Sequence, residues 1–217
     1  MMGLTPVRKE RKAFENTDFN FDKFNFELDA FSEYLKITNL SIDEKLRTYT
    51  DQYKSFDTAA SEYFDNAEMY IKTKTLQLYY SSIIISLYSF LEQTMQDLCI
   101  ITEKKQALKI DDISGTGIFK FKTYLEKVVS IDFTKINNEW NEISKYNHLR
   151  NLFVHTSNSI MDESITNKRK NSIQEIKGLE FKKNSEYIVI EFKNDNPIKN
   201  FIKIINDFMS KIYYEDF

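Results

Sequence analysis

The most apolar stretch of the chain is Leu76–Lys104, LQLYYSSIIISLYSFLEQTMQDLCIITEK. Its apolar side chains recur at spacings of three and four residues and would wrap most of a helix, which predicts the central helix of the core. The uncharged run Thr75–Leu91 is shorter than the ~20 apolar residues of a membrane-spanning helix, and it contains four serines. We therefore expect a buried helix and no membrane span.

Amphipathic helices are predicted on both sides of this stretch. Before it, apolar and aromatic residues at helical spacing predict helices over Phe26–Thr38 and Ser41–Lys74, with Ser41 as the N-cap of the second. After it, the glycines of Ser114–Gly117 break the pattern, and further helices are predicted over Ile118–Ser130 and Lys135–Thr156.

Near the C-terminus, the spacing of apolar residues changes from the three to four residues of a helix to the two residues of a β-strand. Leu179 and Phe181 alternate with charged residues before Lys183–Glu186, and Ile188, Ile190 and Phe192 alternate with Val189 and Glu191 after it. This pattern predicts a β-hairpin over about 178–193 that turns at this segment. Asn196 and Pro197 suit the start of a last amphipathic helix. Because the chain has only 4 Gly and 2 Pro, long regular elements are favoured over many short strands. We expect a mainly α fold with a small β-hairpin before the C-terminal helix.

The domain organisation is expected to be simple. The first 25 residues mix phenylalanines with Asp and Asn without a clean period, so we expect an N-terminal arm over residues 1–25. The remainder, 26–217, has the size of one helical domain. Met1–Lys12 carries charges with no apolar run behind them, so no secretory signal is expected and the protein is expected to be cytoplasmic.

Composition limits the chemistry that the chain can perform. With 30 basic and 33 acidic residues, the chain lacks the basic signature of a protein that coats nucleic acid, so any RNA contact must be local. One cysteine and two histidines exclude an internal disulfide and a zinc cage of Cys and His, and we expect no metal and no cofactor. Cys99 is expected to be a small core hydrophobe, and the acidic face of Glu62, Asp65 and Glu68 to be solvated rather than to bind a cation.

Arg150 is unusual within the predicted helix that contains Tyr146–His155, YNHLRNLFVH. Apolar residues spread around most of this helix, so it should be largely buried, and burying a guanidinium is costly unless an anion pairs with it. Only five of the 30 basic residues are arginines, which indicates that Arg is used where its planar fork is needed for a carboxylate or a phosphate. Asn151 and His155 lie one turn apart on one face, and Arg150 can reach round to them.

Spacing alone leaves two interpretations of this cluster. In the first, Arg150 pairs with a structural carboxylate such as Glu92 or Glu126, and His155 is a residue at the helix C-terminus that the helix dipole favours. In the second, Arg150, Asn151 and His155 bind a phosphodiester and support its cleavage.

The string Arg150-Asn151-Leu152-Phe153-Val154-His155 resembles the R-N-x-x-x-H signature of the HEPN superfamily. The order of elements is also similar over roughly residues 41 to 213: a long helix with Tyr88-Ser89-Phe90-Leu91-Glu92, a Gly-containing break followed by Tyr124-Leu125, the motif helix, a hairpin and a closing helix. The resemblance implies an antiparallel up-and-down helical bundle, homodimers whose paired motif helices form one composite cleft, and metal-independent endoribonuclease activity. The hairpin and the N-terminal arm depart from the minimal bundle.

The resemblance identifies Arg150 and His155 as a catalytic pair, with Asn151 as the polar residue that commonly follows the Arg. RNA can be cut when its own 2′-hydroxyl attacks the adjacent phosphate, and a histidine can move the protons that this reaction requires near neutral pH. Arg150 would stabilise the charge of the transition state, with Asn151 orienting it. His148 has either a supporting role or a surface position. Weaker candidates for holding the RNA backbone are Lys145, Lys168, Arg169 and Lys170, although a charge run after a helix is usually solvated.

The function predicted from the sequence is a metal-independent endoribonuclease, acting as a toxin or an anti-phage defence effector. Its expected partners are RNA, a second copy of the chain through the motif helices, and an antitoxin or other regulatory protein. The alternative is a non-catalytic HEPN-like module that binds nucleotide or RNA or serves as a protein-interaction platform, because many superfamily members have lost cleavage. The intact Arg150, Asn151 and His155 favour the catalytic function.

Overall fold

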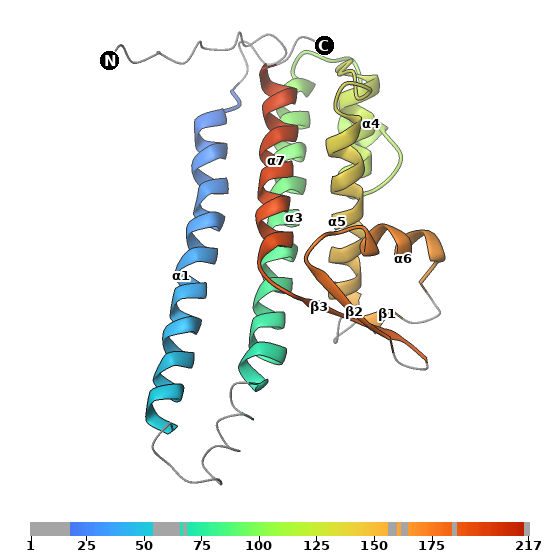
Figure 1. Ribbon diagram of the computed structural model, residues 1–217. Coiled ribbons are helices and arrows are strands. Elements are labelled where there is room, and N and C mark those ends of the chain that lie inside the picture. Colours follow the sequence, from blue (N-terminus) through green and yellow to red (C-terminus); the bar gives the residue numbers. More distant parts are fainter. Residues whose placement is uncertain are drawn as a thin grey trace, which may run out of the picture. The chain divides into compact units, whose positions relative to one another are not determined.

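The computed structural model describes residues 18–53, 66, 69–155, 160–161, 165–183 and 186–214 (Figure 1). The chain is mainly helical, with a small antiparallel sheet before the C-terminal helix, as the sequence predicts. The elements follow in the order α1 (Phe21–Tyr53), η1 (Ile71–Thr75), α3 (Leu76–Glu103), η2 (Ile110–Asp112), α4 (Gly117–Lys127), α5 (Asn137–His155), β1 (Ile160–Met161), α6 (Asn167–Gln174), β2 (Leu179–Lys183), β3 (Ile188–Phe192) and α7 (Asn196–Tyr214).

The described residues divide into two compact units. The first unit holds the start of α1 up to Asn25, the segment Ser89–Ile143, and the chain from Lys203 onward. The second unit holds Phe26–Tyr88 and Ser144–Ile202. Helices α1, α3, α5 and α7 therefore contribute different segments to each unit.

Helix α1 is continuous across the position at which the sequence predicts a break between two helices. Asn20 caps its N-terminus, because the Oδ1 atom accepts a hydrogen bond from the backbone N–H of Lys23 at 2.9 Å. The prediction of Ser41 as an N-cap is wrong, because its hydroxyl donates to the carbonyl of Ile37 one turn earlier, at 3.0 Å. With this polar group satisfied inside the helix and no Gly or Pro nearby, nothing ends the helix there.

The end of the predicted N-terminal arm, residues 1–25, forms the first turns of α1, whereas residues 1–17 lie outside the described residues. Phe21 and Phe24 are buried in the first unit. Phe21 stacks on Tyr213 of α7 with ring centroids 4.6 Å apart, and Phe24 stacks on Phe90 of α3 at 5.5 Å. These two aromatic residues therefore belong to the core of that unit.

Helix α3 contributes core residues to both units, as its apolar sequence predicts. Its fully buried residues include Ile84 and Leu87 in the second unit and Leu91, Met95, Leu98 and Cys99 in the first. The thiol of Cys99 lies 3.7 Å from the carbonyl oxygen of Phe121, and burial raises its pKa to about 12. The prediction that Cys99 is a core hydrophobe is confirmed. Of the predicted helix Ser41–Lys74, residues 54–65 and 67–68 lie outside the described residues, and 71–75 form the π-helical turn η1 that leads into α3.

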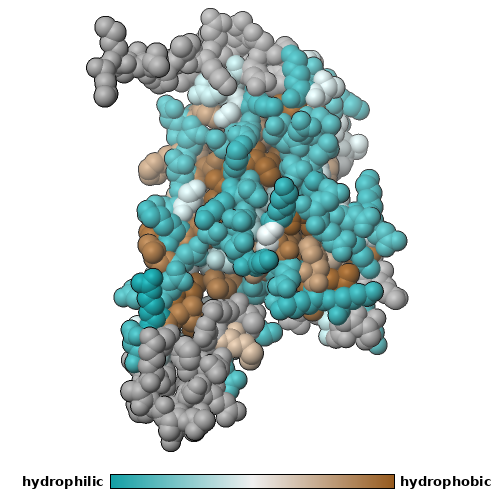
Figure 2. Space-filling model, in the orientation of Figure 1, coloured by the Kyte–Doolittle hydropathy of each residue, from teal (hydrophilic) through white to brown (hydrophobic). Residues whose placement is uncertain are grey.

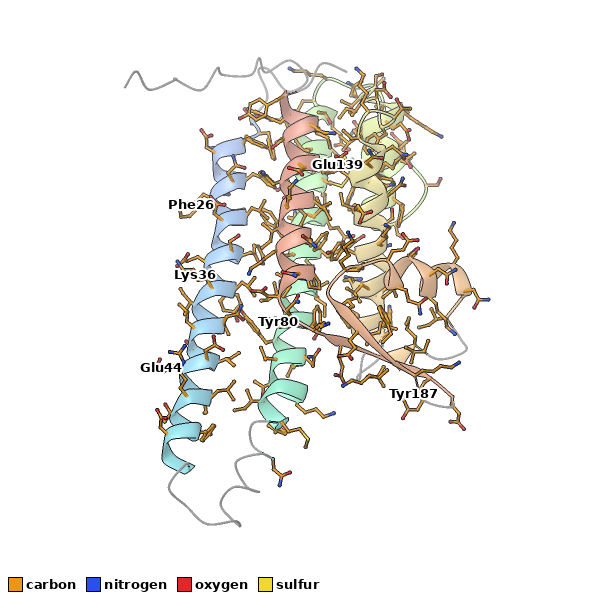
Figure 3. The ribbon with its side chains drawn as sticks, viewed as in Figure 1. Phe26, Lys36, Glu44, Tyr80, Glu139 and Tyr187 are labelled. Carbon is orange, nitrogen blue, oxygen red and sulfur yellow. The ribbon has the colours of Figure 1, made fainter. Side chains whose placement is uncertain are left out.

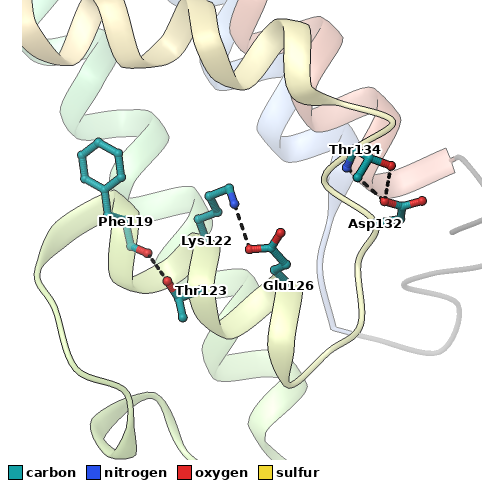
Figure 4. A network of polar contacts seen from close by, with 6 residues as sticks. All are labelled: Phe119, Lys122, Thr123, Glu126, Asp132 and Thr134. Atoms are coloured by element: carbon teal, nitrogen blue, oxygen red, sulfur yellow. Dashed lines mark hydrogen bonds and ion pairs between the residues drawn. The ribbon is translucent and has the colours of Figure 1, made fainter.

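An aromatic cluster forms the part of the first unit between α4, α5 and α7. Trp140 meets the rings of Phe119, Phe133 and Phe208 at centroid distances of 5.6, 5.8 and 6.1 Å. The Nζ atom of Lys122 lies 4.7 Å from the ring centroid of Phe133 and is paired with Glu126 at 2.8 Å (Figure 4). This lysine therefore covers the edge of the cluster while its charge is compensated.

The predicted hairpin is present as β2 and β3, paired antiparallel with Phe181 opposite Ile190. Residues 184–185 of its predicted turn lie outside the described residues. The two-residue strand β1 also pairs with β3, which gives the strand order β1-β3-β2. The side chain of Gln77 on α3 bonds both the N–H and the carbonyl of Phe192, so α3 anchors the end of β3 within the second unit.

Helix α7 begins at Asn196, as predicted. Of the seven apolar residues that helical spacing places on its buried side, Ile202 is only half-buried, and the other six are buried: Ile198, Phe201, Ile205, Phe208, Met209 and Ile212. In the second unit, Tyr146 of α5 stacks on Phe201 with centroids 4.1 Å apart and donates its hydroxyl to the carbonyl oxygen of Pro197 at 2.7 Å. The face drawn in Figure 2 is covered mostly by hydrophilic side chains. None of the described helices combines the length and the apolar character needed to cross a membrane.

Candidate active site

The predicted motif residues all lie on α5, in the part that belongs to the second unit. One face of this segment is buried through Tyr146, Leu149 and Leu152. The other face carries a polar stripe at helical spacing, none of which is fully buried: Ser144, Asn147, His148, Asn151 and His155. The helix is therefore less completely buried than its composition suggests, and Phe153 is half-buried while Val154 is 48% exposed.

A chain of hydrogen bonds holds Arg150. Its Nη1 atom donates to the Oδ1 atom of Asn151 at 2.9 Å, and the Nδ2 atom of Asn151 donates to the Oδ1 atom of Asn147 at 3.2 Å. On another side, the central carbon of the guanidinium lies 5.5 Å from the ring centroid of Tyr88 on α3. Asn147 thus sets the orientation of the Asn151 amide, and that amide and the Tyr88 ring together fix the guanidinium.

The Nε atom of Arg150 is buried and has no hydrogen-bond partner among the described residues. The guanidinium also forms no ion pair within this part of the chain, and Glu126, one of the carboxylates considered from the sequence, pairs with Lys122. A buried donor without a partner destabilises the fold, and a neutral amide does not compensate a full positive charge. Arg150 is therefore positioned by its neighbours, and no anionic group among the described residues neutralises its charge.

His155 is the last residue of α5 and is exposed. It lies one helical turn beyond Asn151 and about 7.5 Å of helical rise beyond Arg150. Its ring is accessible to solvent, so a substrate can reach it. Its position at the helix C-terminus also agrees with the first interpretation from the sequence, in which the helix dipole favours a histidine there.

His148 lies in the second unit, where the charges of two of the predicted RNA-binding residues act on it. His148 is half-buried, and its pKa lies below the usual 6.5 because of burial and, secondarily, because of the charges of Arg169 and Lys168. Both cations are exposed in the first turn of α6. Lys145, in contrast, forms an ion pair with Glu175 at 2.7 Å, next to the end of α6, and Lys170 is half-buried.

Among the described residues, no group of three or more His, Cys, Asp or Glu side chains could hold a metal ion. The acidic residues considered from the sequence, Glu62, Asp65 and Glu68, lie outside these residues.

Away from the motif, the second unit has a cavity of about 440 Å³ between α1 and the start of α7. The hydroxyl of Tyr80 donates to Asn39 at 3.1 Å, and Asn39 donates to Asp195 at 2.9 Å (Figure 3 labels Tyr80). Asp195 also pairs with Lys199 at 2.9 Å. Burial and the charge of Asp195 raise the pKa of Tyr80 to about 12. Asn39, Asp195 and Lys199 of this cavity therefore all have polar partners, whereas the Nε of Arg150 has none among the described residues.

Sequence reasoning missed two residues that position Arg150. Asn147 precedes Asn151 by one turn, so helical spacing could have indicated it. Tyr88 could not be found in this way, because its contact depends on how α3 packs against α5.

Comparison of the chain with protein-family models, with curated proteins and with solved structures gives no match.

Proposed function

We propose that the protein is an endoribonuclease that needs no metal and cuts RNA through attack of the 2′-hydroxyl on the adjacent phosphate. Arg150 and His155 are the catalytic residues, and Asn151 positions the guanidinium. The R-N-x-x-x-H string and its resemblance to the HEPN superfamily motivate this assignment.

The observation that carries the proposal is the state of Arg150. Its guanidinium is fixed by Asn151 and the ring of Tyr88, yet its buried Nε has no partner among the described residues. A guanidinium that is held in place without its charge being neutralised is prepared for an anion with two or more oxygens. A phosphodiester in the transition state, which carries additional negative charge, satisfies this requirement better than the same group before reaction.

The reaction proceeds in one displacement at phosphorus. A neutral His155 accepts the proton of the 2′-hydroxyl, the 2′-oxygen forms a bond to phosphorus, and the bond from phosphorus to the 5′-oxygen breaks. The departing 5′-oxygen takes a proton, and the products are a 2′,3′-cyclic phosphate and a 5′-hydroxyl. Arg150 stabilises the charge on the non-bridging oxygens throughout.

One copy of the motif supplies a single histidine, whereas this reaction benefits from both a base and an acid. We therefore include in the proposal a homodimer in which the motif helices face each other across a two-fold axis, so that His155 of the second copy is the acid. The exposed Val154 within the motif gives such an interface an apolar contact. The resemblance further suggests a toxin or anti-phage defence effector that acts in the cytoplasm and is controlled by an antitoxin or another regulatory protein.

The test is incubation of the purified protein with total RNA and transfer RNA in excess EDTA, followed by analysis of the RNA ends. Cleavage with cyclic-phosphate ends is expected for the wild type and should be absent from Arg150→Ala and His155→Ala. The exposed residue Lys193 provides a matched control, because Lys193→Ala should cut normally. RNA binding without cleavage by the wild type would instead support the non-catalytic module.

A further inference from the structure

We propose that Gln77 of α3 is a positioning residue of the motif, which holds the last turn of α5, and with it His155, through Phe192 of β3. The catalytic role of His155 rests on the proposed function. The attachment of this turn to β3 rests on contacts within the second unit alone.

The last turn of α5 packs through one side chain. Val154 and His155 are exposed, whereas Phe153 is half-buried. The ring of Phe153 meets the ring of Phe192 with centroids 5.6 Å apart. The end of a helix frays easily, because its last carbonyl groups have no partners within the helix. The contact with Phe192 therefore restrains the turn that carries His155.

The chain that follows α5 is attached to the same strand. β1 begins five residues after His155, and it pairs with β3 through Ile160 opposite Val189 and Met161 opposite Ile188. Met161 is 1% exposed, so this pairing belongs to the buried part of the second unit. His155 therefore lies between two attachments to β3, one before it and one after it along the chain.

Gln77 fixes the end of β3. Phe192 lies opposite Leu179, and the adjacent pair is hydrogen-bonded, since the N–H of Lys193 donates to the carbonyl of Gly178 at 2.9 Å. The N–H and carbonyl of Phe192 therefore point away from β2. On that side β1 pairs with other residues of β3, and Gln77 takes the place of a strand. Its Nε2 atom donates to the carbonyl of Phe192 at 3.0 Å, and its Oε1 atom accepts from the N–H.

One face of α3 holds both ends of the motif. Gln77 and Tyr88 lie on this continuous helix, and their spacing places them within about 20° of the same bearing and about 16.5 Å apart along the axis. Tyr88 meets the guanidinium of Arg150 directly, and Gln77 acts on the turn of His155 through β3. The hairpin, which departs from the minimal helical bundle, thereby supports the site.

Two matched variants test this attachment. Gln77→Met removes both hydrogen bonds to Phe192 and keeps a side chain of similar length. Gln93→Met is the control, because Gln93 lies on the same helix but is exposed, and its amide donates to Asp97 one turn away at 2.9 Å.

Backbone ¹⁵N relaxation of the full chain measures the motion of each amide, at a temperature at which all variants are folded. In Gln77→Met the order parameter of His155 should fall from about 0.85 toward about 0.6, whereas that of Asn147, about two turns earlier, should not change. Gln93→Met should leave both values as in the wild type.

Cleavage measurements connect this motion with the proposed reaction. Single-turnover cleavage by Gln77→Met should be about 10-fold to 100-fold slower, because misplacing a catalytic group by about 1 Å can cost about 100-fold. Its affinity for a 2′-deoxy oligonucleotide, which the reaction cannot cut, should equal that of the wild type. A role in stability alone would not separate the rate from the affinity in this way.

Phe153 offers a second pair of variants if Gln77→Met does not fold. Phe153→Leu loses the ring contact and should loosen His155 in the same way, whereas Phe153→Tyr keeps the ring and should match the wild type. An unchanged order parameter of His155 in Gln77→Met or Phe153→Leu would overturn the inference, as would an equal effect of Gln93→Met. A normal cleavage rate in a variant that loosens His155 would overturn the positioning role. If His155 loosens as expected but the wild type does not cut RNA, the attachment stands and the proposed reaction fails.

Discussion

Replacing Arg150 with alanine should abolish RNA cleavage while leaving the protein folded. The hydrogen bond from the guanidinium to Asn151 stabilises the fold by about 1.5–3 kcal/mol as a bond from a charged donor, and the contact with the Tyr88 ring adds about 0.5–1 kcal/mol. Against these, the buried Nε, which has no partner among the described residues, destabilises the fold by about 1–3 kcal/mol. The middle values of these ranges leave a net loss of about 1 kcal/mol, so the free energy of unfolding should fall by less than about 2 kcal/mol.

A change of this size lowers Tm by at most about 8 °C in a chain of this length. The effect on activity should be much larger, because removing one group that stabilises transition-state charge reduces kcat by about 100-fold to 1,000-fold. Thermal unfolding followed by circular dichroism measures the first quantity, and single-turnover cleavage of a labelled RNA measures the second.

Leu149→Ala provides the matched control one position earlier on α5. Leu149 is fully buried, so its truncation should cost about 2–5 kcal/mol of stability while the folded fraction still cuts RNA. Arg150→Lys keeps the charge but not the planar fork, and it should recover little activity. The reasoning is refuted if Arg150→Ala unfolds the protein as Leu149→Ala does, or if it folds and cuts RNA at the wild-type rate.

Four further outcomes follow. Cleavage should persist in excess EDTA, and a loss of activity that magnesium restores would contradict the mechanism. Wild-type protein mixed with His155→Ala should give heterodimers without activity if the site is composite, whereas heterodimers with half the activity would indicate independent sites. Because the pKa of His148 is lowered in the folded state, the unfolded state binds more protons, and stability should fall as the pH decreases below about 6.5. His148→Gln should flatten this fall in Tm between pH 7 and 5, and an unchanged slope would assign it to other groups. Gly178→Ala should destabilise the fold by about 1–3 kcal/mol in thermal melts, because Gly178 has a φ of +95° and an added Cβ would lie 2.8 Å from the Cδ atom of Pro197; an unaltered Tm would show that the turn can relax.

The elements predicted correctly from the sequence are those whose hydrophobic period is strong. Helix α3 is apolar around most of its surface, α7 buries one clear stripe, and the hairpin alternates with a period of two and buries Ile190 and Phe192 of β3. The eight-residue α6 has one apolar residue, Ile173, and β1 has two residues, so neither offers a period to detect. The N-cap prediction for Ser41 was wrong for a different reason. A serine can cap a helix or donate to a carbonyl within one, and only the structure distinguishes the two roles.

The candidate site was partly predictable for a similar reason. The spacing of Arg150, Asn151 and His155 places them together on one helix, because helical geometry is local. Which cations lie near His148 depends on the position of α6, and α6 was not predicted. The sequence could name the four basic residues, but it could not show that Lys145 is already paired with Glu175 while Lys168 and Arg169 have no partner among the described residues.

The Nε of Arg150, which no described residue satisfies, connects the stability of the fold with the proposed function. Natural sequences generally satisfy their buried donors, and exceptions are concentrated where a ligand supplies the missing partner. A carboxylate placed beside Arg150 would have accepted a hydrogen bond from the Nε–H, but it would also have kept a phosphate from binding there. The chain instead holds the guanidinium through a neutral amide, which is itself held by Asn147, and through an aromatic ring. Neither neighbour competes with an anion for the positive charge. An anion that binds at Arg150 in the folded protein stabilises the folded state. An uncleavable RNA should therefore raise the Tm of the wild type more than that of Arg150→Ala.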